Sequence, residues 1–319
     1  MVCPCGCGRP FRKTSETREE MQLEKYYRKW FWLLILPAIL LFLFIIAIPF
    51  IIGTIYSFTS WRGTYFAGGS FWQSFIGVEN YVKAFANEKF VHSLIYTCLY
   101  TLVAVIAINV VALAFSLMLN NLRRGVGFYR TVFFLPNMLG GLAMGFVWQF
   151  IFQVVYTDLL FSPEGLFHVE FLRYMTQDTT KALFALVIMT VWQSAGYMML
   201  IYISGLNSIP GDLYEAAEID GAGPIRKFFT VTLPLLMPSV TIVLFLTLAN
   251  SFKLLDQNVA LTNGDFNTRL IALQILRTIQ DNTPPDYGTA QAQAVVFFVI
   301  IAAISLLQVS LTRRKEVEY

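Results

Sequence analysis

The sequence predicts an all-α integral membrane protein with about six transmembrane helices. Two observations support this fold class. The chain of 319 residues is 56% hydrophobic and only 13% charged, whereas soluble globular domains are about 45–50% apolar and about 25% charged. It also contains six long stretches without Asp, Glu, Lys or Arg. Each stretch has at least the roughly 20 residues that a helix needs to cross a bilayer.

Each of the six stretches is expected to be a helix. Lipid offers the backbone no hydrogen-bond partners, so a single spanning segment must satisfy its own N–H and C=O groups. Trp30, Trp32, Trp61 and Trp72 flank the first stretch, as aromatic anchors at a membrane interface often do. In chain order, the predicted spans are residues 30–61, 90–122, 131–157, 182–211, 228–252 and 287–312.

The distribution of Lys and Arg predicts the orientation of these spans. With the N-terminus inside, the inner segments carry 15 Lys and Arg, and the longer outer segments carry 7. Positive charge concentrates on the cytoplasmic side of membrane proteins, so both termini are predicted to be cytoplasmic. The inner segments are then 1–30, 122–130, 207–230 and 313–319, and the outer segments are 60–92, 156–181 and 257–288.

The predicted organisation is a cytosolic N-terminal arm (1–30), a transmembrane domain (31–312) and a cytosolic tail (313–319). Within the arm, Glu16–Trp30 fits either an amphipathic helix on the membrane surface or a solvated charged tail. Cys3, Cys5 and Cys7 lack the spacing and the His partner of a structural zinc site. No metal site is therefore predicted, and the role of these cysteines stays open. The net charge of +3 is too small to indicate nucleic-acid binding.

The loop between the fourth and fifth spans, 207–230, has the signals of a short capped helix. Asp212 is a preferred residue at a helix N-terminus, and Glu215 three residues later completes a variant of the capping box. The predicted helix covers Leu213–Asp220. Gly221 is expected to end it, because glycine adopts the left-handed conformation at little cost.

The rest of this loop gives two alternatives for what the helix does. Pro224 can begin a second helix, where its missing N–H does no harm. Ala216 and Ala217 keep the surface of the first helix thin enough to enter a groove in another protein. The helix either docks against such a partner or only lies at the membrane interface as a connector.

The same residues carry a resemblance to a known family. Glu215, Ala216, Ala217, Asp220, Gly221 and Ala222, followed by Phe228, Leu233, Pro234 and Pro238, resemble the EAA motif. That motif marks the membrane subunits of binding-protein-dependent ABC importers. Further segments are similar to the carbohydrate-uptake branch of this family, which includes maltose and glycerol-3-phosphate permeases. These segments are 77–85, 129–137, Trp192 with Gly196, and 205–210.

The resemblance implies a type I ABC importer permease that forms half of a translocation pathway for a carbohydrate or related polyol. The EAA segment would be a cytoplasmic coupling helix that contacts a separate ATPase, through Glu215, Ala216, Ala217, Asp220 and Gly221. The implied partners are a second, different permease subunit, two ATP-binding subunits that hold ATP and magnesium, and an extracellular solute-binding protein. The implied location is the plasma membrane of a bacterium, with the chain passing through the lipid bilayer several times.

Two features of the sequence limit what this resemblance implies about activity and substrate. ATP hydrolysis of this type needs a P-loop, and the sequence contains no Gly-Lys pair. The chain is therefore expected to be a transporter subunit without enzymatic activity and without a cofactor of its own. The segment 261–266 also lacks the second Gly and the Pro that many sugar permeases carry after the fifth span, which leaves the substrate subgroup open.

Polar and aromatic residues on spans three to five are candidates for the solute pathway. Sugars are bound by amides and hydroxyls together with aromatic faces, although each of these side chains would also serve helix packing. Lys253 and Asp256 are expected to lie three residues apart on one helix, where they would pair with each other. The candidates are Asn137, Trp148, Gln149, Gln153, Trp192, Gln193, Tyr197, Asn250, Ser251, Lys253 and Asp256, with Ser194 and Gln257 beside them.

Two other functions stay open from the sequence. A stand-alone secondary transporter would usually keep an ionisable side chain well inside a span, and none is found there. A scaffold or sensor would use the loop helix to recruit a partner without moving a solute. The sequence does not identify the solute or the resting conformation.

Overall fold

A computed structural model describes residues 30–122, 124–161, 165, 167, 169–314 and 316. The chain divides into two compact units, residues 1–56 and residues 57–319. The predicted surface helix Glu16–Trp30 and the cluster of Cys3, Cys5 and Cys7 fall outside the described residues, except for Trp30.

The described part of the first unit is one helix, Trp30–Tyr56, which includes a π-helical turn η1 (Leu43–Ala47) and the helix α2 (Ile48–Tyr56). None of the residues in its most apolar stretch is buried. A helix that is hydrophobic all round is suited to a lipid environment. The prediction of a span over 30–61 was wrong at its end, because Thr59 and Trp61 form isolated β-bridges with Phe75 and Phe66 instead.

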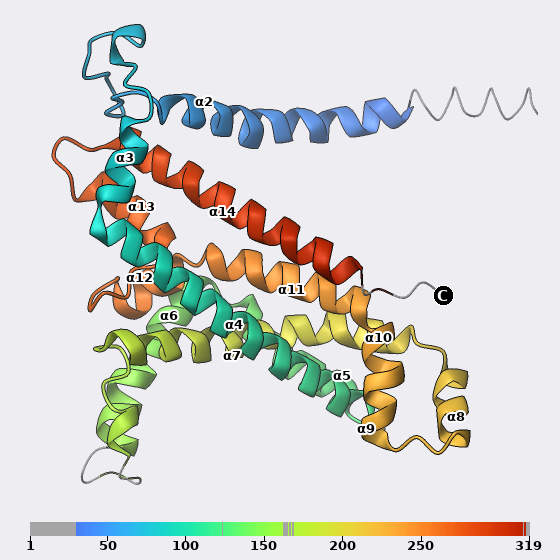
Figure 1. The fold of residues 1–319 in the computed structure, drawn as a ribbon. Helices are drawn as coiled ribbons and strands as arrows, with labels where there is room; N and C mark the ends of the chain where they lie inside the picture. Colours follow the sequence, from blue (N-terminus) through green and yellow to red (C-terminus); the bar gives the residue numbers. More distant parts are fainter. Residues whose placement is uncertain are drawn as a thin grey trace, which may run out of the picture. The chain divides into compact units, whose positions relative to one another are not determined.

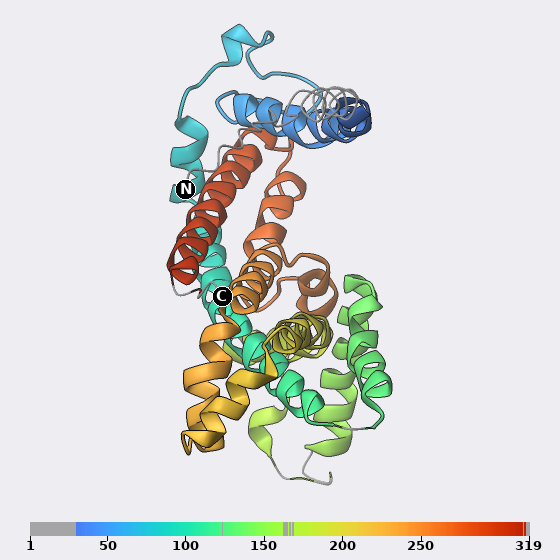
Figure 2. The same cartoon turned by 90° about the vertical axis from the view of Figure 1, so that its right-hand side faces the viewer.

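In the second unit, α4 (Glu88–Asn120) and α7 (Thr179–Asn207) pack against each other. Asn87 and Asp178 fix where these helices begin, since each side chain accepts hydrogen bonds from two backbone N–H groups of the first turn. Figure 2 looks at the fold from the right-hand side of Figure 1, and α7 is seen nearly end-on there. The last span is α14 (Tyr287–Arg313), which matches the prediction within one residue.

The predicted third span, 131–157, is not one continuous helix. It consists of α5 (Val126–Phe134), the 3₁₀ turn η3 (Leu135–Met138), α6 (Gly141–Phe150) and the π-helix η4 (Ile151–Leu160). The break follows from Pro136, which has no N–H to donate, and from the extended backbone of Leu139 and Gly140. The stretch long and apolar enough to cross the membrane is 141–160.

The predicted fifth span, 228–252, is also broken. Its first part comprises α9 (Pro224–Lys227), η6 (Phe228–Thr232) and α10 (Leu233–Leu235), and its second part is α11 (Met237–Phe252). The two parts are bent by 70°. If the two parts are counted as one span, the described residues contain six candidate membrane spans, as predicted. If they are not, the number is five.

The predicted outer loop 257–288 contains two helices that were not expected, α12 (Asp256–Thr262) and α13 (Ile271–Gln280). The α12 helix packs on α6, where Gly141 and Gly145 face Asp256 and Ala260 without room for a side chain. The segment contains many polar residues, so its sequence did not indicate buried helices. In the structure the buried polar side chains are hydrogen-bonded within the chain. The amide of Asn258 bonds Thr262, the carbonyl of Thr268 and the N–H of Leu270.

The remaining elements lie at the two ends of the second unit. Figure 1 shows α3 (Glu79–Ala86) and α13 at one end, and α8 (Gly211–Ile219) at the opposite end. Two 3₁₀ turns, η2 (Trp72–Ser74) and η5 (Glu170–Leu172), complete the described elements.

Candidate functional site

The loop helix α8 is built as a short helix with a tight end. Gly221 has a φ of +72°, and its N–H donates to the carbonyl of Glu218, while the N–H of Ala222 donates to the carbonyl of Ala217. These two bonds form the Schellman motif that ends many helices at a glycine. The prediction for Gly221 is confirmed, and Pro224 begins α9 as predicted.

The predicted capping box at the start of α8 was wrong. The helix begins at Gly211, with Pro210 in the capping position, and no side chain bonds its first N–H groups. Asp212 lies in the first turn instead, where a negative charge still complements the positive end of the helix dipole. The fixed φ of Pro210 positions the chain for the first turn without a polar cap.

The faces of α8 differ in exposure. Tyr214 and Ala217 face the rest of the chain, while Glu215, Ala216 and Asp220 are exposed. Ile219 is 87% exposed.

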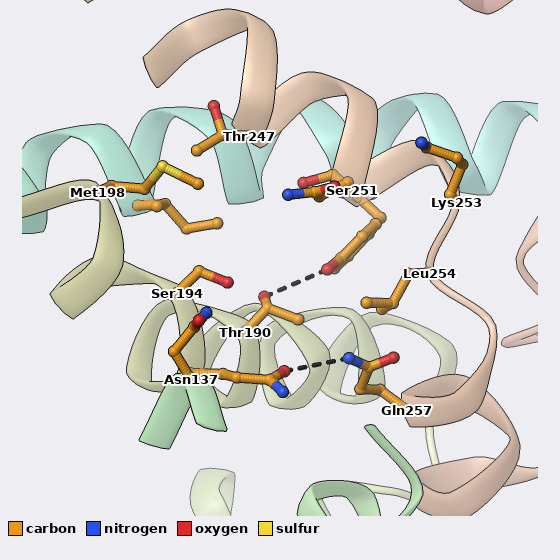
Figure 3. A pocket seen from close by; sticks show the side chains of 13 residues that line it. Asn137, Thr190, Ser194, Met198, Thr247, Ser251, Lys253, Leu254 and Gln257 are labelled. Carbon is orange, nitrogen blue, oxygen red and sulfur yellow. Dashed lines mark hydrogen bonds between the residues drawn. The ribbon is translucent and has the colours of Figure 1, made fainter. Parts of the chain in front are cut away.

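A polar cavity of about 340 Å³ lies between α4, η3, α7 and α11 (Figure 3). Side chains from these elements and from the 253–257 segment point into the same space. The cavity is lined by Tyr100, Ile108, Asn137, Thr190, Gln193, Ser194, Met198, Thr247, Asn250, Ser251, Lys253, Leu254 and Gln257.

Part of this polar lining is already hydrogen-bonded within the chain. Gln257 Nε2 donates to Gln193 Oε1 at 3.1 Å, and Gln193 Nε2 donates to the carbonyl of Leu139 at 3.1 Å. The second bond satisfies a carbonyl at the break of the third span. The Tyr100 hydroxyl donates to Thr190 Oγ1 at 3.2 Å. These bonds link α7 to α4, to α12 and to the chain at Leu139 around the cavity.

Other polar groups of the lining are left available. The side chains of Asn137, Ser194 and Asn250 make no hydrogen bond to any other residue in the described part of the chain. Polar groups on a protein surface normally exchange partners with water or ligand. The cavity therefore offers amide and hydroxyl groups to a hydroxyl-rich solute.

A part-buried polar network adjoins the cavity at Thr247. Tyr202 lies one helical turn beyond Met198 on α7, and its hydroxyl donates to Asn109 Oδ1 at 2.6 Å. Asn109 Nδ2 in turn donates to Thr247 Oγ1 at 3.1 Å. This network joins α4, α7 and α11.

A second cavity, of about 660 Å³, is apolar. It lies between α4, α5, η3, α6 and α7, and Trp148 and Trp192 form part of its wall. The two indole rings are arranged edge to face, with centroids 5.7 Å apart. The aromatic faces thus line a different space from the amides, which the sequence did not distinguish.

The structure separates the predicted pathway residues into three groups. Five of them line the polar cavity, together with Ser194 and Gln257: Asn137, Gln193, Asn250, Ser251 and Lys253. Trp148 and Trp192 line the apolar cavity. The others, Gln149, Gln153, Tyr197 and Asp256, line neither cavity.

These last four have other surroundings. Gln149 donates to the carbonyl of Leu261 at 3.4 Å, and Tyr197 packs near Phe134. Gln153 is exposed. The expectation that Lys253 and Asp256 share a helix was wrong, because α11 ends at Phe252 and α12 begins at Asp256.

Sequence reasoning missed several residues of the cavity, above all Tyr100, Thr190 and Thr247. A usable signal was present on α7, where Thr190, Gln193 and Ser194 recur at helical spacing. Among the residues that the structure describes, no group of three or more His, Cys, Asp or Glu side chains is arranged to hold a metal ion.

Residues 123–317 match a family model described as "Binding-protein-dependent transport system inner membrane component". The chain is 40% identical over 291 residues to the probable starch degradation products transport system permease protein AmyD of Thermoanaerobacterium thermosulfurigenes, covering 91% of this chain and 96% of AmyD. It is 31% identical to the multiple sugar-binding transport system permease protein MsmF of Streptococcus mutans, covering 92% and 98%.

The fold is similar to that of a chain in the crystal structure of a bacterial ABC transporter involved in the import of the acidic polysaccharide alginate. The TM-score is 0.74 at 21% identity, and the likeness covers 92% of this chain and 99% of that one. A second structure of a bacterial alginate ABC transporter, in complex with an alginate pentasaccharide-bound periplasmic protein, matches with a TM-score of 0.73 at 22% identity, covering 91% and 96%.

Proposed function

Because the chain belongs to the family of binding-protein-dependent transport system inner membrane components, we propose that it forms one half of the translocation pathway for an oligosaccharide. As a member of this family it is a transport subunit of an ABC importer and not an enzyme. The relatives named for starch degradation products and for multiple sugars support this class of solute.

The observation that carries the proposal is the polar cavity. Its volume of about 340 Å³ lies within the roughly 300–1,000 Å³ of known ligand pockets. Asn137, Ser194 and Asn250 provide donors and acceptors without a partner in the described part of the chain. A sugar hydroxyl can replace the water on these groups at little cost in free energy, which suits a solute that must bind and leave again.

The proposed energy source is a separate subunit. The exposed face of α8, with Glu215, Ala216 and Asp220, would contact one of two ATP-binding subunits, which hold ATP and magnesium. A second, different permease subunit would complete the pathway, and an extracellular solute-binding protein would deliver the solute. The family description supports a location in the bacterial plasma membrane, and the Lys and Arg distribution supports an orientation with both termini in the cytoplasm.

The first test is purification of the tagged chain from its native host in mild detergent, with mass spectrometry of the proteins that accompany it. We expect a second six-span protein and a P-loop ATPase in stoichiometric amounts. Recovery of the chain alone, stable and able to transport in response to an ion gradient, would overturn the proposal in favour of a secondary transporter.

The second test addresses the cavity. Asn250→Leu removes the amide that would bind the sugar in the cavity. We expect it to reduce uptake of radiolabelled maltotriose by proteoliposomes about tenfold, which corresponds to a loss of about 1.4 kcal/mol of binding free energy. Gln153→Leu is the matched control, because Gln153 is exposed and lines neither cavity. Equal uptake by both variants would exclude the cavity as the solute site.

A further inference from the structure

A third cavity, of about 490 Å³, lies between the start of α4 and the turn 264–269 that follows α12. We call it the turn pocket. The helix α4 begins directly after α3, which Figure 1 shows at the end of the second unit opposite α8. The lining residues that matter for its chemistry are Glu88, Lys89, Asp265, Phe266, Asn267 and Arg269.

Hydrogen bonds fix the turn against α4 and α7. Thr179 Oγ1, at the start of α7, donates to the carbonyl of Phe266 at 2.6 Å. The N–H of Ile271 donates to Thr97 Oγ1 of α4 at 2.8 Å. The buried hydroxyl of Thr268 donates to the carbonyl of Asp265 at 2.6 Å and so holds the turn internally. The pocket is therefore formed before any ligand binds, as most small-molecule sites are.

The backbone of the turn presents an aromatic ring to the pocket. Phe266 and Asn267 have φ angles of +53° and +60°, and such values are uncommon for a bulky residue such as phenylalanine. Phe266 is 56% exposed and lines the pocket. An exposed aromatic face in a fixed turn can stack on the apolar face of a sugar ring.

Four polar side chains of the turn pocket have no partner within the chain. Those of Glu88, Lys89, Asp265 and Asn267 make no hydrogen bond or ion pair with one another or with any other residue that the structure describes. Such groups exchange partners with water or a ligand. Two carboxylates, an ammonium group and an amide thus line one space and leave their hydrogen-bonding capacity to what enters it.

The balance of charge indicates the class of ligand. Lys89 and Arg269 are positive, and Glu88 and Asp265 are negative, so the lining favours neither an anion nor a cation. Arg269 also contacts Asp281, at 3.4 Å from Nη1. Hydroxyl groups donate to carboxylates and accept from ammonium and guanidinium groups, and these charge-assisted bonds are the stronger kind. A neutral solute with many hydroxyls uses both signs at once.

The turn pocket is separate from the polar cavity. Gln257, the second residue of α12, lines the polar cavity, whereas Gly264, two residues after the end of α12, lines the turn pocket. The 7 residues of α12 span about 10 Å. The two cavities therefore lie at the two ends of one short helix.

We propose that the turn pocket is a second binding site for a neutral oligosaccharide. Phe266 is its stacking platform, and Lys89, Asp265 and Asn267 bind the hydroxyls. The proposal rests on the proposed function for the class of solute. Its volume lies within the range of roughly 300–1,000 Å³ of known ligand pockets. In the orientation predicted from Lys and Arg, the site opens on the outer side of the membrane.

The test is maltotriose binding to the complete transporter in lipid nanodiscs, without nucleotide and without solute-binding protein. Saturation-transfer NMR detects weak binding from the signals of the sugar, and a titration gives the Kd. All variants carry Asn250→Leu, which weakens the polar cavity. We expect a clear signal in this background.

Adding Lys89→Met and Phe266→Ala should weaken the remaining binding about tenfold. Phe266→Tyr in place of Phe266→Ala, with Lys89 intact, keeps an aromatic face and should retain the signal, which shows that the turn still folds. Lys83→Met is the matched control, because Lys83 lies six residues before Lys89 and pairs with Glu79 outside the pocket. It should change nothing.

A Kd in the Lys89 and Phe266 variant equal to that of Asn250→Leu alone, or no signal in the Asn250→Leu background, would overturn the inference. An alginate trisaccharide at equal concentration should give the weaker signal, and the reverse would contradict a neutral ligand.

Uptake by the same preparations in proteoliposomes, with ATP and the binding protein, separates this inference from the proposed function. ATP-driven uptake without binding in the turn pocket would refute the second site alone. Binding that depends on Phe266 and Lys89 without any uptake would refute the proposed function and keep the site.

Discussion

The end of α8 depends on the backbone conformation of Gly221, and this effect can be tested separately from side-chain packing. Gly221 has a positive φ, yet a Cβ at this position would meet no atom within 4 Å. Any defect from a side chain at Gly221 therefore comes from backbone conformation and not from a clash. Gly223, two residues later, has an ordinary φ of −67° and is equally open.

This contrast gives the first prediction. Gly221→Val should abolish uptake. A β-branched residue in the left-handed region is strained by about 1–2 kcal/mol, so the Schellman turn that ends α8 would not form. Gly223→Ala should transport normally. The measurement is solute uptake by cells, normalised to the amount of chain in the membrane. Normal uptake by Gly221→Val would show that the turn does not set the position of α8.

The ion pair at Glu218 gives a prediction about pH. The pKa of Glu218 is lowered in the folded chain by Lys227, so its contribution to stability is present above the unfolded-state pKa. That contribution is lost as the pH falls through the lowered value. The difference in Tm between the unmodified chain and Lys227→Met should therefore be constant from about pH 8 to about pH 6 and shrink only in strong acid. A difference that vanishes near neutral pH would contradict this assignment.

At the scale of elements, the close approach of α6 and α12 positions the outer part of the cavity. Gly145 lies against Ala260 of α12, and a Cβ at Gly145 would collide with it. A Cβ at the neighbouring Gly141 would likewise lie only 2.8 Å from the Cβ of Asp256. The two glycines let the helices pack closely, as small residues do in membrane proteins.

Gly145→Leu should destabilise the chain by about 1–3 kcal/mol, the usual cost of overpacking. Gly127→Leu is the control, since Gly127 is also helical and has no atom within 4 Å of an added Cβ. Thermal unfolding in detergent, followed by the signal of a thiol-reactive dye, should show a lower Tm for the first variant alone. Equal Tm values would mean that α12 yields to the larger side chain.

At the scale of the whole molecule, the two ends of the second unit are chemically different. One end carries α8 with its carboxylates, and the opposite end carries α3 and the loop 57–77, where Trp72 is 85% exposed. If the Lys and Arg distribution sets the orientation, only the second end faces outward.

Accessibility of introduced cysteines tests this orientation in intact cells, in a background without the native cysteines. Ser70→Cys in the loop 57–77 should react with a membrane-impermeant maleimide, and Asp220→Cys at the end of α8 should react only after the membrane is opened. The reverse pattern would invert the topology and remove the proposed contact with a cytoplasmic ATPase.

The sequence by itself determined the membrane class, the positions of the long spans and the glycine turn after α8. These features are local. Hydropathy over about 20 residues decides whether a segment enters the membrane, and a helix end depends on a few neighbouring residues. The start of α8 was misplaced by two residues because Asp212 and Pro210 are both good starting residues and only the folded loop selects between them.

Only the tertiary structure decided where the fifth span bends, how far the break in the third span interrupts it, and which polar residues meet. The Gln193 side chain bonds a carbonyl 54 residues away, and Tyr100 bonds Thr190 across 90 residues. Such contacts depend on which faces of α4, α7 and α11 pack together, and no local pattern records that. For the same reason Trp192 and Gln193, adjacent in the sequence of α7, line two different cavities.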